Sequence, residues 1–142
     1  MIDELRKLLE TYPLYFYMVR GNGNHTDGFK LSIQGNTIED VIYLAEHITP
    51  FLAESGISFK LGTKKLIDYT GDHPQQKHKL LTIYAPNEVP IREFAETIYQ
   101  LMEDYTGGDS VKQPDSYTHY KNAIYYRNDR NENGEYIKAN KK

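Results

Sequence analysis

Three short segments of this chain alternate between apolar and polar residues, namely 29–34, 57–61 and 79–84. Successive side chains of an extended strand point to opposite faces, so this alternation predicts strands with one buried and one polar face. Two longer segments, 38–55 and 91–105, repeat their apolar residues every three or four positions and predict amphipathic helices. Such a chain has to fold as a sheet with helices packed against one face.

The flanking segments complete a predicted α+β domain. Residues 2–11 predict a short N-terminal helix, 14–19 and 123–127 predict further strands, and 128–142 form a polar tail that frays at its end. Pro50 is expected to kink or split the first long helix. We therefore predict one domain over 1–142, with a mixed or antiparallel sheet and two main amphipathic helices on one face.

Composition narrows the class of protein. The 142 residues carry a formal charge of −3, which gives no long-range reason to expect nucleic acid or a membrane as partner. There is no cysteine, so disulfides, thiolate metal sites and a cysteine nucleophile are excluded. No apolar run is long enough to span a bilayer. These features predict a cytoplasmic, bacterial-type protein.

The polar faces of the predicted strands carry cations. Lys30 and Lys60 each occupy the side of a strand opposite its apolar residues, and Arg127 shares a side of the last strand with Ala123 and Tyr125. Three strands could therefore bring positive charge to one sheet face. Lys79 falls instead on the side of Leu81. A sheet face exposed to solvent also carries lysine, so patterning alone leaves an ordinary solvated face as the alternative to an anion site. The last part of the chain adds tyrosines that could form a peptide-binding surface or pack in the core: Tyr117, Tyr120, Tyr125 and Tyr126.

The amino-acid sequences of these strands resemble those of a known family. Residues 28–33 look like a G-W-K-x-H-V-S element, and residues 57–61 are similar to an I-S-F-K-F strand. Residues 79–86 resemble G-K-F-I-T-I-Y-P, and residues 125–127 match a closing Y-Y-R. In this order, with helices between them, the elements resemble the phosphoserine/phosphothreonine lyase domain of class III lanthipeptide synthetases. The resemblance covers roughly 13–137, and bacterial phosphothreonine lyase effectors share the fold more distantly.

The resemblance implies a reaction and roles for residues. The family removes phosphate from phosphoserine or phosphothreonine in a precursor peptide by β-elimination, leaving dehydroalanine or dehydrobutyrine, and uses no metal or organic cofactor. By resemblance, Lys60 is the general base and Tyr84 lies near the reacting centre. The residues that would hold phosphate are Lys30, Lys79 and Arg127, with Lys64 or Lys65 as helpers or merely solvated loop residues. An amine acts as a base only when neutral, and neighbouring cations favour that form.

The chain departs from the family at the general acid. The family has a histidine where this chain has Ser32, and a serine cannot donate a proton near neutral pH as imidazole can. The family also places an arginine after an aspartate before the last strand, whereas here Ser116 follows Asp115. Four histidines in predicted loops could replace the acid or could be ordinary surface residues: His25, His73, His78 and His119.

Three functions therefore remain open from the sequence. The first is a lyase that acts on a phosphorylated precursor peptide, with kinase and cyclase activities supplied by separate proteins. The second is a catalytically impaired, lyase-like module that binds a phosphopeptide or a protein partner, which Ser32 and Ser116 favour. The third is a small accessory or inhibitor protein that uses the fold only to bind protein.

Overall fold

The computed structural model of the protein describes residues 2–22, 28–72, 74–109, 111, 114 and 116–128. Within them the chain forms six strands, which are β1 (Phe16–Val19), β2 (Phe29–Gln34), β3 (Phe59–Gly62), β4 (Lys79–Tyr84), β5 (Thr118–His119) and β6 (Ile124–Asn128). The helical elements are α1 (Ile2–Thr11), α2 (Ile38–Glu54), α3 (Lys64–Ile67), α4 (Ile91–Leu101) and the short 3-10 helix η1 (Pro74–His78).

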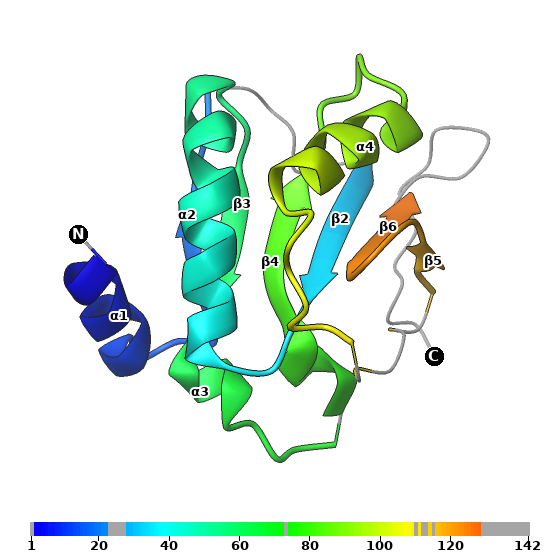
Figure 1. Ribbon diagram of the computed structural model, residues 1–142. Helices are drawn as coiled ribbons and strands as arrows, with labels where there is room; N and C mark the ends of the chain where they lie inside the picture. The colour runs from blue at the N-terminus through cyan, green and yellow to red at the C-terminus, as the bar shows by residue number, and fades with distance from the viewer. Residues whose placement is uncertain are drawn as a thin grey trace.

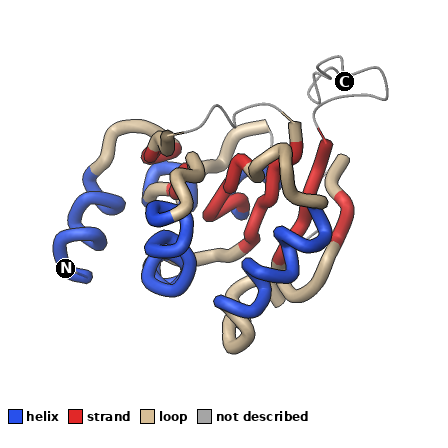
Figure 2. The backbone as a smooth tube through the Cα atoms, turned by 90° about the horizontal axis from the view of Figure 1, so that it is seen from above, coloured by secondary structure: helices blue, strands red, loops and turns tan. Residues whose placement is uncertain are grey.

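The strands form one sheet in the order β1-β3-β4-β2-β6-β5, and every neighbouring pair is antiparallel. The helices α2 and α4 lie side by side on one face of this sheet, with α1 against the outer side of α2 (Figures 1 and 2). An ion pair of 2.8 Å between Arg6 and Glu39 joins α1 to α2. The predicted α+β class, with two main helices on one sheet face, is confirmed, and the sheet is antiparallel rather than mixed.

The core lies between these two layers. The apolar positions of the alternating strands are buried, apart from the partly buried Phe29, and they face buried leucine, isoleucine and phenylalanine side chains of α2 and α4. The sheet contributes Leu31, Ile33, Phe59, Leu61, Leu81 and Ile83, each at most 5% exposed. Burial of this layer removes a continuous apolar surface from water, and it leaves the other sheet face for polar side chains.

Local signals explain the start of α2. The hydroxyl of Thr37 accepts a hydrogen bond from the backbone N–H of Asp40, and the Asp40 carboxylate accepts one in return from the N–H of Thr37. This capping box satisfies backbone donors that the first turn of a helix leaves without partners. The helix continues through Pro50 to Glu54, so the expected split at Pro50 is wrong.

The structure also differs from the expectation at the end of α4 and in three short elements. The second long helix ends at Leu101 rather than 105. The predicted loop 71–77 contains most of η1, and α3 and β5 were not predicted because four and two residues carry no periodic pattern. The predicted tail lies outside the described residues from position 129 onward. Among the helices described, none has the length and apolar character needed to cross a bilayer.

Candidate functional site

Strand register brings the predicted cations to one face of the sheet. Lys30 in β2 lies directly opposite Tyr84 of β4 on one side and Arg127 of β6 on the other. Residues that face each other across antiparallel strands project from the same face. Lys30, Tyr84 and Arg127 therefore form a row across three strands, on the face that the helices do not cover.

A second row runs beside the first. Lys60 of β3 pairs with Thr82 of β4, Thr82 pairs with Ser32 of β2, and Ser32 pairs with Tyr125 of β6. Because Ser32 is two residues from Lys30, both rows project from the same face. We call this face, made by the two rows together with Gln34 and Lys79, the polar face.

Lys79 joins the polar face through an irregularity in the sheet. The alternation of 79–84 placed Lys79 on the side of Leu81, and this expectation is wrong. Between β2 and β4 the register shifts after Ile33, so that Gln34 lies opposite Lys79 instead of Leu80. An extra residue in one strand reverses the direction of every side chain beyond it, which turns Lys79 toward the polar face.

Each cation of the polar face contacts an aromatic ring. Lys60 Nζ lies 4.2 Å from the centre of the Phe16 ring, and Lys30 Nζ lies 5.8 Å from that of Tyr84. Lys79 and Arg127 contact the same ring, that of Tyr117, at 4.9 and 5.0 Å. The face of an aromatic ring attracts a cation and replaces part of its lost hydration. Tyr117 is therefore a contact shared by Lys79 and Arg127, although these residues come from different strands.

Lys60 has the electrostatic setting of a base. Burial of its side chain lowers the pKa of the Lys60 amine, and the positive charge of Lys30 lowers this pKa further. Both causes favour the neutral amine, which is the form that accepts a proton. The influence of Lys30 also shows that the two lysines are close enough to interact, despite lying in strands that β4 separates.

The middle of the polar face is buried rather than open, contrary to the expectation of an open sheet face. Ser32 and Gln34 are 0% exposed, and Thr82 is 4% exposed. The hydroxyl of Ser32 and both amide atoms of Gln34 have no hydrogen-bond partner in the described structure. Buried polar groups normally find partners, so these atoms are available to hydrogen-bond with a water or a polar ligand.

The two predicted helper lysines lie apart from these rows. Lys64 donates to the Asp68 carboxylate at 2.6 Å on the exposed side of α3. Its neighbour Lys65 is exposed, and its Nζ lies 5.2 Å from the Tyr15 ring. The structure therefore places neither lysine in the cation rows, although Lys65 lies beside the edge strand β1.

Three histidines can be placed. The register sets His119 of β5 opposite Tyr125, at the end of the row that contains Ser32, and its ring lies 4.9 Å from that of Tyr125. Its Nε2 lies 2.8 Å from the carbonyl oxygen of Asn122. The Nδ1 atom of His78 lies 3.1 Å from the Gly35 carbonyl, and that of His47 in α2 lies 2.9 Å from the Tyr43 carbonyl. His25, His73 and Asp115 lie outside the described residues.

The tyrosines divide between the two sides of the sheet. Tyr117 and Tyr125 belong to the polar face, and burial raises the pKa of the Tyr125 hydroxyl. Tyr120 donates a hydrogen bond to Glu96 of α4, and Tyr126 packs its ring on Phe29. The hydrogen bonds to Glu96, that of Tyr120 first, lower the pKa of this carboxyl to about 2.

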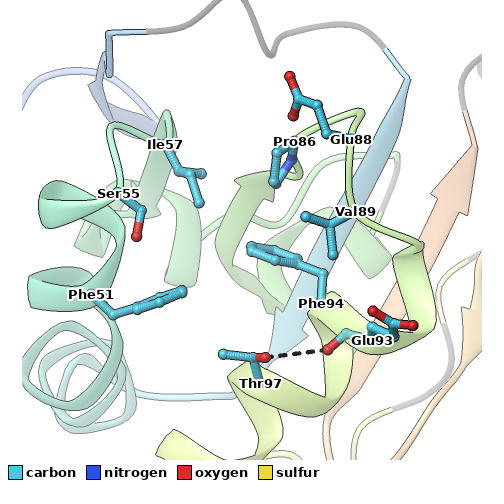
Figure 3. Close-up of a pocket in the computed structure, with 9 residues that line it drawn as sticks. All are labelled: Phe51, Ser55, Ile57, Pro86, Glu88, Val89, Glu93, Phe94 and Thr97. Carbon is cyan, nitrogen blue, oxygen red and sulfur yellow. Dashed lines mark hydrogen bonds between the residues drawn. The ribbon is translucent and has the colours of Figure 1, made fainter.

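A separate hollow of about 380 Å³ lies on the helix side, between the end of α2 and the start of α4. Phe51 of α2 and Phe94 of α4 point toward each other across it, and Glu88 and Glu93 stand at its rim (Figure 3). No cation lines this hollow. It is therefore unsuited to a phosphate group, whose charge these carboxylates would repel.

Sequence reasoning missed the contribution of Phe16 and the position of Tyr117. Phe16 alternates with Tyr17 in β1, but which of the two faces the cations depends on the pairing of Phe16 with Gly62. Tyr117 follows Ser116, whose φ of 70° lies in the left-handed region, and no local pattern predicts where such a turn directs the next side chain. No model of a known protein family matches the chain, and a search of well-characterised proteins found no match either.

Proposed function

We propose that the polar face binds the phosphate group of a phosphorylated serine or threonine in a peptide, and that Lys60 then removes the α-proton of that residue in a β-elimination. The observation that carries the proposal is the position of Lys60: partly buried, beside Lys30, with both burial and that charge lowering its pKa. An amine whose pKa is lowered in this way can act as a base.

The phosphate would lie among Lys30, Lys79 and Arg127. Lys79 and Arg127 both contact the Tyr117 ring, and Lys30 lies in the row with Arg127. Charged donors form strong hydrogen bonds to phosphate oxygens, and the guanidinium of Arg127 can bind two of them at once. The buried Ser32 hydroxyl, in the row next to that of Lys30, would supply a further donor.

The elimination balances without a cofactor. Lys60 takes the proton from Cα, the electron pair of that C–H bond forms the Cα–Cβ double bond, and the Cβ–O bond breaks to release phosphate. The products are a dehydroalanine or dehydrobutyrine residue and inorganic phosphate. Cations around the departing oxygen stabilise the charge that develops on it, which is the largest contribution a preformed polar site makes.

The protonation of the leaving phosphate distinguishes this chain from the family it resembles. Ser32 takes the place of the family's histidine, so the proton has to come from another group, and the Lys30 ammonium lies in the adjacent row. His119 lies two strands from Ser32, about 10 Å away at the usual strand spacing. The fold itself, an antiparallel sheet with helices on one face and cations on the other, supports the proposed likeness to phosphothreonine lyases.

A second function rests on the same face. A module that binds a phosphopeptide without eliminating phosphate needs the cations but no acid, and the serine at position 32 favours it. In either case the phosphorylated peptide comes from a separate kinase, and any ring closure of a dehydrated lanthipeptide precursor belongs to a separate cyclase. An accessory protein that only binds protein would be indifferent to phosphate.

Mass spectrometry of a phosphothreonine peptide incubated with the protein separates these functions. A lyase releases phosphate and leaves a dehydrated peptide, whereas a binding module retains the phosphopeptide with an affinity that salt weakens. A protein that binds phosphorylated and unphosphorylated peptide equally has neither function.

Lys60→Arg isolates the role of the base. Arginine keeps the positive charge but stays protonated, so we expect elimination to fall by a factor of about 10² to 10⁴ while phosphopeptide affinity changes little. Lys7→Met removes a charge from the exposed side of α1 and serves as the matched control. Full elimination by Lys60→Arg would rule out Lys60 as the base.

A further inference from the structure

We propose that a hollow beside the polar face is a subsite for one large apolar side chain of the phosphorylated peptide, next to or near the phosphorylated residue. This inference rests on the proposed function of the polar face and names the kind of sequence that the site selects. The hollow measures about 210 Å³ and lies between the edge strand β1, α3 and η1, lined by Tyr15, Phe16, Leu66, Tyr69 and Gln76.

The hollow adjoins the cation rows through Phe16. Phe16 lines it, and the same Phe16 ring lies 4.2 Å from Lys60 Nζ. Tyr15 also lines it and contacts Lys65 Nζ at 5.2 Å. A peptide whose Cα–H lies at Lys60 therefore has its neighbouring side chains within reach of this hollow, because an extended chain advances about 3.3 Å per residue.

Its size and lining select an apolar side chain. Four of the five lining residues are aromatic or aliphatic, and Gln76 contributes the only side-chain amide. Pockets for whole small ligands start at about 300 Å³, so a hollow of about 210 Å³ suits a single leucine-sized or phenylalanine-sized group. The two lysines near its mouth favour a peptide that carries negative charge close to that group, as a phosphorylated residue does.

The walls are held in place before any peptide arrives. The hydroxyl of Thr63 donates to the Leu14 carbonyl at 2.7 Å, and the Thr63 N–H donates to the Tyr15 carbonyl at 3.1 Å. The Tyr15 and Tyr69 rings pack edge to face with centres 5.7 Å apart. Gly62 lets α3 approach β3 closely, because a Cβ there would lie 2.8 Å from Leu66 Cδ2. A preformed subsite loses less entropy on binding than one that has to be ordered.

The test uses a set of phosphothreonine peptides that differ only in having alanine, leucine or phenylalanine at each position within two residues of the phosphothreonine. Burying such a side chain is expected to raise kcat/KM, or affinity if the protein only binds, about tenfold to a hundredfold over alanine at one position. Gln76→Trp introduces a large ring from an exposed position at the rim and should abolish the preference while sparing the alanine peptide.

Leu14→Ala is the control variant, because Leu14 is 60% exposed and does not line the hollow. It should keep the preference. Equal use of all the phosphopeptides, or a preference that Gln76→Trp leaves unchanged, overturns the subsite while the proposed function stands. Equal binding of the phosphorylated and unphosphorylated leucine peptides overturns both, since the apolar group is then recognised without the phosphate site.

Discussion

Two buried serines, Ser32 in β2 and Ser58 immediately before β3, should respond in opposite directions to substitution by alanine. The Ser32 hydroxyl is buried without a hydrogen-bond partner in the described structure, whereas the Ser58 hydroxyl, 2% exposed, accepts a hydrogen bond of 2.8 Å from the Gly21 N–H. A buried hydroxyl without a partner costs about 1 to 3 kcal/mol. We therefore expect Ser32→Ala to raise the free energy of unfolding by about 1 kcal/mol.

Ser58→Ala should lower the free energy of unfolding by about 1 kcal/mol, because the Gly21 N–H then loses its acceptor. Urea denaturation measures both changes. With an m-value of about 2 kcal/mol per molar urea, the midpoints should move by about 0.5 M in opposite directions. If Ser32→Ala destabilises the fold as Ser58→Ala does, the hydroxyl of Ser32 has a structural partner and the reasoning about a ligand position is wrong.

The effect of inorganic phosphate on the stability of the wild type and of Ser32→Ala tests whether Ser32 takes part in phosphate binding. A ligand at a hundredfold excess over its Kd adds about 2.7 kcal/mol to the stability of the form that binds it. Phosphate should therefore stabilise the wild type more than Ser32→Ala, since the alanine lacks the donor. The advantage of the variant in plain buffer should shrink as phosphate is added. An unchanged difference between the two proteins would contradict a role of Ser32 in phosphate binding.

Two further predictions concern Lys60 and the cap of α2. Lys30→Met removes the charge that, beside burial, lowers the pKa of Lys60, so this pKa should rise. Less neutral amine is then present at a given pH, and the increase of elimination rate with pH should move to higher pH. An unchanged pH–rate profile would contradict this role of Lys30. Thr37→Ala removes the hydroxyl that caps α2 and should lower the free energy of unfolding by about 1 kcal/mol, as measured by urea denaturation. Thr97→Ala is the control: it removes a hydroxyl that donates to a carbonyl within α4, and it should change the free energy of unfolding little.

The layers of the fold could be predicted because they follow from local periodicity. The alternation in 29–34 and 57–61 determined which side chains of these strands face the helices, and the helical period of 38–55 located α2 to within one residue. The apolar periodicity of each segment indicates which of its faces is buried, without any knowledge of the segments that it packs against. The presence of Lys30, Lys60 and Arg127 on a common face followed from the same patterns and is confirmed by the register.

The finer composition of the site could not be predicted, because it depends on how distant segments pair. The side chain of Lys79 lies on the polar face because of a register shift between β2 and β4, which the local alternation of residues does not predict. Phe16 contacts Lys60 only because β1 pairs with β3 at the edge of the sheet. Tyr117 contacts two cations because the chain turns back over the sheet before β5.

The gathering of cations on one face is itself an argument for an anionic ligand. Like charges brought together and partly removed from water destabilise a fold, and burial, together with the charge of Lys30, lowers the pKa of Lys60. The rings of Phe16, Tyr84 and Tyr117 offset part of that cost. A phosphate ester bound among these cations, as we propose, would be attracted by each of them, and this attraction would offset their mutual repulsion.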